Sequence, residues 1–357
     1  MTAKPSQELL RSLSDEHVLR ALMSARKLTR AELAVETGLS KPTVGESVRR
    51  LVEQGLVADT GERTPGGRGK GRVGSFYSLA SDVGVALVVT IAPAGVTAEC
   101  VDAYGDVVTT EHHAIASPAE VAGVLPAVVA ETVAAQNVRL CTVSAADPVD
   151  RRTGRLVQLP DSPFLVGSLD PVAVLRPLLN GPVIVDNDVN WAAQAEHAVL
   201  GVADFAYLYL GEGLGCAVVS DGEVRRGHAG LSGEISHLIT AGPSGAMAFI
   251  EVFGALGLRQ AGSTAIDVDR LLAADSPTLE VVARAVSGVI TALVALADPA
   301  VVVVGGPWGP ALLDAISSAP RPVSVVAASV AEPSLTGARA EALDRLRTAL
   351  VEASRNS

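Results

Sequence analysis

The sequence predicts an α/β protein in two parts, a small winged helix-turn-helix followed by a larger α/β body. Three observations support this. The chain has 357 residues, more than one hydrophobic core usually organises. Residues 1–80 carry 13 Lys and Arg against 9 Asp and Glu, whereas residues 81–357 carry 15 against 30. Apolar strand patterns begin only after residue 84 and then alternate with helical patterns.

The composition indicates a globular protein of a reducing compartment. Hydrophobic residues make up 48% of the chain and charged residues 19%, which excludes a disordered or fibrous protein. Cys100, Cys141 and Cys216 lie far apart without a C-x-x-C pair, which argues against disulfides and a structural thiolate metal site. The longest nearly uncharged stretch among the first hundred residues, 83–98, contains Pro93 and is shorter than a membrane span. We therefore expect a cytoplasmic protein without a membrane segment.

The basic module opens with three helical patterns. Residues 7–24 carry an apolar stripe that includes Leu9, Leu10, Leu13, Val18, Leu19 and Leu22. Thr29 and Glu32 have the spacing of a capping box, which opens a helix that runs to Thr37, and Gly38 supplies the following turn. Ser40 then caps the third helix.

We expect this third helix to enter the DNA major groove. Its apolar residues Val44, Val48 and Leu51 recur on one face, which turns the rest outward. Two short helices joined by a glycine turn, with small polar residues at the start of the second, are typical of a helix-turn-helix. The residues of this helix expected to contact DNA are Lys41, Thr43, Ser47 and Arg50. The alternative is a plain pair of packed helices.

Residues 59–79 predict a β-ribbon, the wing. Its tip, residues 63–72, is rich in glycine and basic residues, a combination that suits DNA phosphates or the minor groove. The expected contacts are Arg68, Lys70 and Arg72. The alternative is a linker. The net charge of +4 on residues 1–80, beside an acidic body, favours double-stranded DNA as the partner of this module.

The body reads as buried strands separated by turns and helices. The strand patterns cover residues 85–90, 96–101, 107–110, 140–144, 183–185, 206–210, 217–219 and 301–304, with a helix at 118–135. Four further motifs follow in order: VDNDVN at 185–190, GEGLG at 211–215, GEISH at 233–237 and VGG at 304–306.

Behind a winged helix, this order of motifs resembles the ROK family of sugar-responsive repressors and sugar kinases. The resemblance implies an actin-like ATPase fold of two lobes around a cleft, a homodimer or higher oligomer, and a sugar site in the cleft. It sets the expected domains at 1–80 for the winged helix, 81–190 for the first lobe and 191–336 for the second lobe. A C-terminal helix at about 337–355 is expected to pack back on the first lobe.

Two departures from the family separate this chain from the kinases. The kinases open their first strand pair with D-x-G-G-T, and residues 90–94 read TIAPA instead, with Pro93 lacking an amide donor. The second phosphate loop, G-T-G-I-G in the family, carries Glu212 in place of the hydroxyl, and a carboxylate repels phosphates. We therefore expect no enzyme activity and no cofactor.

The resemblance implies a sugar site formed by Asn187, Asp188, Glu234, His237 and Glu251. In ROK kinases the residue at Asp188 is the general base, and here it would remain a ligand only. The family's zinc site keeps His237 but has lost its cysteines, so no metal is expected. The loop at 145–150 has lost its glycine, and Asp161 replaces an asparagine, so the ligand can differ from those of the kinases.

Structural roles are open for each of these residues. Asn187 and Asp188 can cap a helix, Glu234 and His237 can form an ion pair on a helix surface, and Glu251 can open a helix. Trp308 can fill an adenine pocket or pack in the core.

The sequence therefore predicts a transcriptional regulator, a repressor, that binds a palindromic DNA operator and senses a sugar or sugar derivative through an inactive kinase-like body. One alternative keeps the DNA-binding module but makes the body a ligand-free scaffold for dimerisation or protein interaction. Another is an ATP-dependent sugar kinase with a regulatory N-terminal module.

Overall fold

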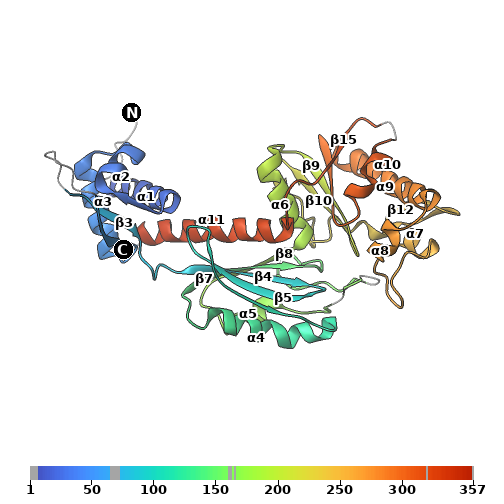
Figure 1. The fold of residues 1–357 in the computed structure, drawn as a ribbon, viewed down its shortest axis with the longest axis horizontal. Coiled ribbons are helices and arrows are strands. Elements are labelled where there is room, and N and C mark those ends of the chain that lie inside the picture. The colour runs from blue at the N-terminus through green and yellow to red at the C-terminus, as the bar shows by residue number, and fades with distance from the viewer. Residues whose placement is uncertain (1–6, 65–72, 160–162, 165, 319–320, 356–357) are drawn as a thin grey trace.

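The computed structural model describes residues 7–64, 73–159, 163–164, 166–318 and 321–355. It is elongated and consists of a small N-terminal domain, a first lobe and a second lobe (Figure 1). Helix α11 (Pro333–Arg355) leaves the second lobe, crosses the first lobe and ends beside the N-terminal domain. The last turn of α11 therefore lies beside α1 (Gln7–Ala25), where Arg355 pairs with Glu16.

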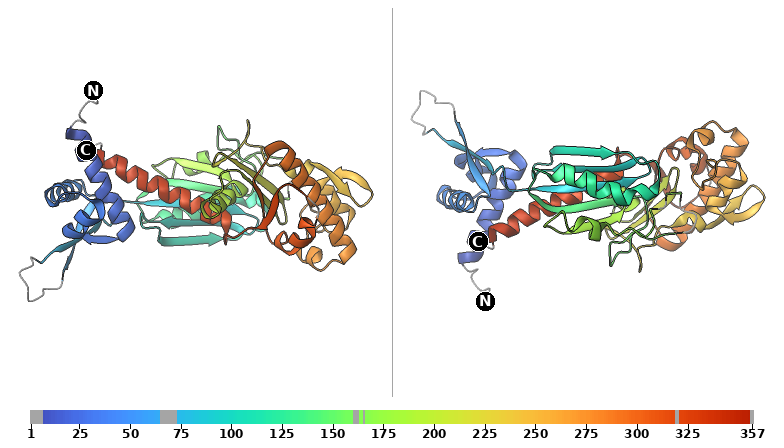
Figure 2. Two further views of the ribbon diagram at one scale, coloured as in Figure 1. Left: turned by 90° about the horizontal axis from the view of Figure 1, so that it is seen from above. Right: turned by 90° about the horizontal axis from the view of Figure 1, so that it is seen from below.

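The N-terminal domain is a winged helix, as predicted. Its helices are α1 (Gln7–Ala25), α2 (Arg30–Thr37) and α3 (Lys41–Glu53), and its strands are β1 (Lys27–Thr29), β2 (Val57–Arg63) and β3 (Ser75–Leu79). The strands form an antiparallel sheet in the order β1-β3-β2. The predicted caps are confirmed: Thr29 and Glu32 form a capping box, Gly38 ends α2 with a φ of 69°, and Ser40 caps α3. Strands β2 and β3 extend away from the helices (Figure 2).

The first lobe is built on a five-stranded sheet in the order β6-β5-β4-β7-β8. Its strands are β4 (Val85–Ala92), β5 (Gly95–Val101), β6 (Val107–His113), β7 (Val138–Ala145) and β8 (Val183–Asn187). Helix α4 (Val121–Val133) covers one face and α11 the other (Figure 1), and the short helix α5 (Pro171–Leu175) lies beside α4. Because β4, β7 and β8 run parallel, they end at one edge of the sheet, where α6 (Asp188–Leu200) begins.

The second lobe holds a sheet in the order β11-β10-β9-β14-β15. Its strands are β9 (Phe205–Leu210), β10 (Leu214–Ser220), β11 (Glu223–Val224), β14 (Val301–Gly305) and β15 (Ser324–Ala327). A hairpin, β12 (Ile239–Gly242) with β13 (Gly245–Ala248), lies outside this sheet. The helices are α7 (Phe249–Ala255), α8 (Val268–Leu272), α9 (Ser276–Ala297) and α10 (Leu313–Ser317). The strands predicted from the apolar runs are all present, with ends that differ by a few residues.

Among the described residues, α9 is the one helix whose length and apolar composition would suffice to cross a membrane. In this fold it is a core helix. Its buried residues Val282, Val286 and Ile290 belong to the main core of the second lobe, and α9 contacts β12 and α7. A buried core helix of this length meets the same criterion without a membrane.

The winged helix and the first lobe share one hydrophobic core with α11. Leu19 and Leu22 of α1 belong to the same cluster of buried residues as Val88 of β4 and Leu346 of α11. Around this core Arg26 pairs with Asp106, and the Gln54 side-chain amide donates a hydrogen bond to the Ser354 carbonyl. The winged helix is therefore held against the first lobe by packing as well as by polar contacts.

Candidate functional site: the cleft and the exposed face of helix α3

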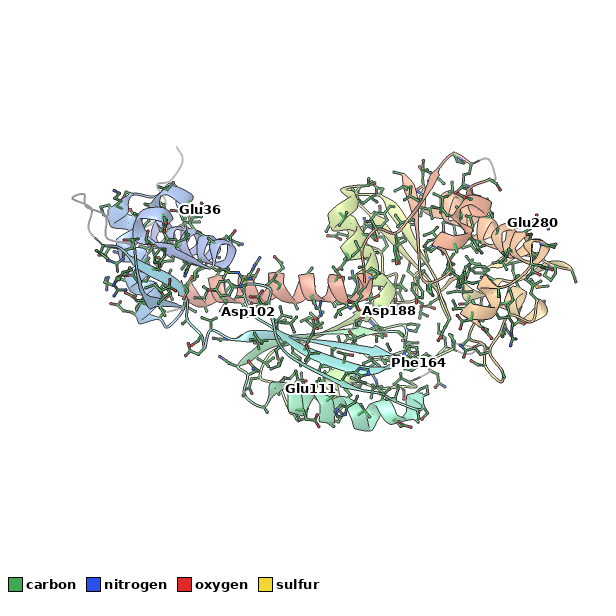
Figure 3. All side chains as sticks on the ribbon, in the orientation of Figure 1. Glu36, Asp102, Glu111, Phe164, Asp188 and Glu280 are labelled. Atoms are coloured by element: carbon green, nitrogen blue, oxygen red, sulfur yellow. The ribbon has the colours of Figure 1, made fainter. Side chains whose placement is uncertain are left out.

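A cleft of about 600 Å³ opens between the two lobes at the edge where β8 ends. It brings together four of the five residues predicted for the sugar site, Asn187, Asp188, Glu234 and His237. Figure 3 places Asp188 and Phe164, another residue of the cleft wall, in the region where the lobes meet. The role of these residues in sugar binding stays a prediction. All four line the same cleft, which is therefore the candidate site.

Asn187 is the N-cap of α6. Its side-chain oxygen accepts a hydrogen bond from the Val189 N–H at 2.9 Å. Its amide nitrogen donates to the carbonyls of Ala145 at 3.3 Å and Asp147 at 3.2 Å. Asn187 thus performs the capping role that was its structural alternative, and it also ties the loop after β7 to the start of α6.

Asp188 is the first residue of α6. Burial raises the pKa of its carboxyl to about 6, although hydrogen bonds from the N–H groups of Val189 and of Asp188 itself and from the Asn187 side chain act in the opposite direction. The start of a helix favours a carboxylate, so burial is the larger effect here. A carboxyl in this setting can accept hydrogen bonds from ligand hydroxyls or be neutralised by a ligand cation.

Glu234 reaches the cleft from the second lobe. It follows Gly233, whose φ is 96° and where an added Cβ would lie 1.8 Å from the Cys216 carbonyl oxygen, so only glycine fits. Burial, followed by the charges of Asp188 and Asp147, raises the pKa of Glu234 to about 7. His237, exposed, ends a short 3₁₀ turn (Ile235–His237), so the two residues do not form a pair on a helix surface.

Asp147 is a further acidic residue at this site, and the sequence did not single it out. It is 1% exposed and lies between Ala146 and Pro148, which both line the cleft. One carboxyl oxygen accepts a hydrogen bond from the Val166 N–H at 3.2 Å, and the other has no hydrogen-bond partner in the described part of the chain. Burial raises its pKa to about 7, and the charge of Asp188 adds to this. The signal in the sequence was the carboxylate in a loop where the family carries a glycine.

The prediction that Glu251 lies at the sugar site is wrong. Glu251 stands in the first turn of α7 with an exposed side chain and pairs with Arg259 at 2.9 Å. It is not among the residues that line the cleft. The shortened segment before it folds as the β12–β13 hairpin, which leads directly into α7.

Known proteins share both halves of this architecture. Residues 95–252 match the model of the ROK family, and residues 17–68 match that of the MarR family. The xylose repressor of Bacillus spizizenii is 24% identical over 251 residues, which cover 65% of this chain and 62% of the repressor. The chain carries a ROK family domain. It spans less than two thirds of the length of this curated relative.

Two solved structures show the fold of the ROK domain. One is a ROK family transcriptional regulator, a homolog of the E. coli MLC protein. It superposes on 96% of this chain and 99% of its own with a TM-score of 0.62 and 18% identity. The other is a ROK family glucokinase from Streptomyces griseus in complex with glucose and AMPPNP. It covers 72% of this chain and 99% of its own with a TM-score of 0.53 and 23% identity.

The two positions of the phosphate loops both lie at the cleft of the ROK domain. Pro93 lines the cleft from the turn between β4 and β5, which the pairing of Ala92 with Gly95 closes. Glu212 lines it from the turn between β9 and β10, where its carboxylate accepts a hydrogen bond from the Gln260 side chain at 3.4 Å. A nucleotide phosphate at this place would meet a residue without an N–H group and a carboxylate.

Trp308 is a packing residue of the ROK domain. It is fully buried, its ring centre lies 5.7 Å from that of Phe253, and its indole N–H donates to the Gly211 carbonyl at 2.9 Å. The core interpretation of Trp308 is therefore confirmed, and the hydrogen bond holds the turn that carries Glu212.

The segment that carries zinc ligands in the family is the β12–β13 hairpin here. The buried Thr240 hydroxyl donates to the Ala285 carbonyl of α9 at 2.7 Å, and Gly288 leaves the space for it. Among the described residues, no group of three or more His, Cys, Asp or Glu is arranged to hold a metal ion. The hairpin is held to α9 by a hydrogen bond and by packing of Leu238 and Met247 on the core.

In the winged helix, the residues of α3 that were predicted to contact DNA differ in their exposure to solvent. Lys41 is exposed, and Thr43 is half-buried with its hydroxyl 2.8 Å from that of Ser40. The prediction that Ser47 faces outward is wrong. Ser47 is fully buried, because it lies three residues after Val44 and four before Leu51, on the apolar face. Arg68, Lys70 and Arg72 lie outside the described residues.

The predicted outward role of Arg50 is also corrected. Its guanidinium pairs with Asp15 of α1 at 2.6 Å and donates to the Ser47 hydroxyl at 3.2 Å, so it holds α3 against α1. Arg49, which the sequence analysis passed over, is exposed and pairs with Glu46 and Glu53 of its own helix. The two arginines flank the apolar stripe on opposite sides, and the position of α1 decides which one is free to meet DNA.

Proposed function

We propose that this chain is a DNA-binding transcriptional regulator, a repressor, that senses a sugar or sugar derivative through a catalytically inactive ROK domain. The observation that carries the proposal is the combination of a winged helix with a two-lobed body whose cleft holds Asp188 and Glu234 but has Pro93 and Glu212 at the phosphate loops. The xylose repressor among its relatives supports this assignment. We place the protein in the cytoplasm, as a homodimer on a palindromic operator.

The DNA contact is proposed for α3 and the wing. Lys41 at the start of α3 and Arg49, about two turns further on, are exposed. An exposed lysine at the N-terminal end suits a helix that enters the major groove by that part. The cationic groups of both residues add phosphate contacts, and the acidic body turns away from DNA by charge repulsion. Two copies on one operator present two such helices to successive turns of the groove.

The route from the cleft to the winged helix is proposed to run through two helices. Asp188 opens α6, and Trp191, one turn later, packs against α11 so closely that a Cβ at Gly337 would lie 2.0 Å from the Trp191 carbonyl oxygen. Helix α11 continues to α1, where Arg355 pairs with Glu16. A ligand that favours one closure of the lobes then moves α6 and α11 together, and operator affinity changes by the ligand's preference between the two states.

The same cleft is proposed to be inactive toward ATP. Phosphoryl transfer depends on donors and cations that hold and neutralise the triphosphate, and Pro93 and Glu212 supply neither. Incubation of the full chain with ATP, Mg²⁺ and a panel of hexoses should give no sugar phosphate above background. Turnover that disappears in Asp188→Asn would contradict this and make the chain a kinase.

The regulator proposal is tested by selecting binding sites from a random pool of double-stranded DNA with the full chain. We expect a palindromic consensus, and Lys41→Ala should weaken binding to it with a shallower dependence on salt. Arg284→Ala removes an exposed arginine from α9 of the second lobe and serves as the matched control, with unchanged binding. Unselective DNA binding, or wild-type affinity in Lys41→Ala, would contradict the proposal.

A ligand-free scaffold is the second candidate, and two observations favour it. The Asn187 side-chain amide is used by the cap and the loop after β7, and Glu251 points away from the cleft. Operator binding that no sugar of the panel changes, together with a melting temperature that no sugar raises, would assign the body this role.

A further inference from the structure

We propose that the cleft binds a sugar that carries a free amino group, so that its ligand enters as a cation. This inference rests on the proposed sensing function and names the class of ligand that the cleft accepts. Three observations support it: the charges of the residues around the cleft, one buried carboxyl without a counter-charge, and the strong hydrogen-bond or arginine partners of the other buried acids.

The described residues that line the cleft include three carboxyl groups and neither lysine nor arginine. Asp188 comes from the first lobe, and Glu212 and Glu234 come from the second. The basic residue among them is His237. A neutral sugar could bind in this cleft but would leave the negative charge of the carboxylates unbalanced. A sugar phosphate or a nucleotide would be repelled by all three carboxylates.

Asp147 adds a fourth carboxyl directly behind this wall. It is 1% exposed, and one of its oxygens has no hydrogen-bond partner among the described residues. The charge of Asp188 raises the pKa of Asp147, and the charge of Asp147 raises that of Glu234. The side-chain amide of Asn187 donates to the main-chain carbonyls of Ala145 and of Asp147 itself, not to the Asp147 carboxyl. The described protein thus provides a single N–H group to a buried carboxyl that can accept several.

In the part of the chain that the structure describes, the other buried acids all have strong partners. Asp15 pairs with Arg50, Glu99 with Arg339, and Asp186 with Arg226. Glu196 accepts hydrogen bonds from two main-chain N–H groups and the Ser329 hydroxyl. The contrast is sharpest between Asp186 and Asp188, two residues apart, because the first has a guanidinium 2.6 Å away and the second faces an open cleft.

A group of acids that repel one another is a preformed place for a cation. Burial raises the pKa of Asp147 and of Glu234 to about 7, with the charges of neighbouring carboxylates adding to the rise, and burial alone raises the pKa of Asp188 to about 6. Each carboxylate is therefore costly without a counter-charge. An ammonium group bound among them supplies that charge. The hydroxyls of the same sugar ring donate to the remaining carboxylate oxygens.

The size of the cleft fits a sugar of this kind with room for a second ring. A volume of about 600 Å³ lies within the range of about 300–1,000 Å³ that small-molecule pockets usually have. Glu212 lies in the second lobe at the other loop, where it can meet a second amine of a longer ligand. Hexosamines and their short oligomers therefore form the test panel.

The experiment uses isothermal titration calorimetry on the full chain with matched sugars. For the gluco, galacto and manno series we compare the free amine, the N-acetylated amine, the parent hexose and the amine 6-phosphate. In at least one series the free amine should bind at least tenfold more tightly than the other three. Asp147→Asn should remove most of this preference, with affinity for the parent hexose unchanged, and Glu234→Gln should act in the same direction.

Asp150→Asn is the matched control, since it makes the same change in the same loop at a carboxyl that caps the turn at Arg152 and Thr153. It should keep the preference for the amine. Parent or acetylated sugars that bind as tightly as the amine, tighter binding of the phosphate, or a panel without any binding would each overturn the inference.

Operator binding measured in parallel separates this inference from the proposed function. If a neutral sugar binds as tightly as the amine and changes operator affinity, the proposed regulator function is supported and the proposal of a cationic ligand is contradicted. If operator binding itself is absent, the regulator falls whatever the sugars do.

Discussion

Gly337→Ala is expected to destabilise the protein through the contact between α11 and α6. Gly337 lies in α11, where an added Cβ would come 2.0 Å from the carbonyl oxygen of Trp191 and 2.7 Å from its carbonyl carbon. Ordinary van der Waals contact begins at 3.4 Å, and the added Cβ would lie 2.0 Å from the carbonyl oxygen. The helices must therefore separate by about 1.4 Å, the difference between 3.4 Å and 2.0 Å. The obstacle is main chain and cannot rotate away as a side chain would.

The magnitude follows from two opposed terms. Overpacking of a core contact costs about 1–3 kcal/mol. Replacing glycine by alanine within a helix returns up to about 1 kcal/mol. We therefore expect the free energy of unfolding to fall by about 1–2 kcal/mol. Gly123→Ala in α4 is the matched control, because a Cβ there has nothing within 4 Å and should stabilise the protein.

Urea unfolding of both variants, followed by far-ultraviolet circular dichroism, provides the measurement. The two substitutions are identical in chemistry, so opposite signs isolate the contact with Trp191. Because α11 continues to the winged helix, Gly337→Ala should also reduce the effect of the sugar on operator affinity while sugar binding itself persists. A stability within 0.5 kcal/mol of the wild type, on the order of ordinary surface substitutions, would refute the reasoning.

Four further substitutions test individual side chains. Arg50→Ala leaves the buried Asp15 without its hydrogen-bond donor and should cost about 1–3 kcal/mol in urea unfolding, whereas Arg49→Ala should leave stability unchanged and weaken operator binding in an anisotropy titration. Because the folded state raises the pKa of Asp147 to about 7, it binds this proton more tightly than the unfolded chain, and stability is lost as the pH rises from about 4 to 7. Asp147→Asn should flatten that dependence and be more stable than the wild type at pH 8, as compared by unfolding at pH 5 and pH 8. Thr240→Val should lower stability by about 1 kcal/mol through loss of the bond to α9, and a strong chelator should leave the melting temperature of the wild type unchanged.

Local sequence signals were sufficient for the winged helix. The capping box at Thr29 and Glu32, the positive φ of Gly38 and the cap at Ser40 act within a few residues, so their spacing fixes the helix ends. The outward face of α3 needed more than spacing. Arg49 and Arg50 are equivalent in the helical pattern, and a residue far away in the chain, Asp15, binds the second of them.

The position of the cleft was also predictable, because the carboxyl ends of parallel strands meet at one edge of a sheet. The motif at 185–190 overlaps the end of β8, one of three parallel strands, so it had to lie at that edge of the first-lobe sheet. The motif at 233–237 comes after β11, which pairs antiparallel with β10, so strand direction alone did not place it at the cleft. What the motifs could not give was the use of each side chain. Position 187 carries the asparagine of the family's motif, but its side-chain oxygen and nitrogen form hydrogen bonds with the start of α6 and with the loop after β7.

The acidic character of the cleft has a different origin from the one that the resemblance implies. The shortened segment before α7 takes Glu251 out of the site and pairs it with Arg259. The loss of glycine in the loop after β7 brings in Asp147, which is buried and has only one N–H donor among the described residues. The exposed carboxylate of Glu251 thus lies outside the cleft, and the buried carboxylate of Asp147 lies behind the wall of the other lobe, where water does not compensate its charge. A proton or a cationic ligand can supply the missing charge, since burial raises the pKa of Asp147 to about 7. The proposed cationic sugar rests on this, whereas the motifs alone would suggest a neutral one.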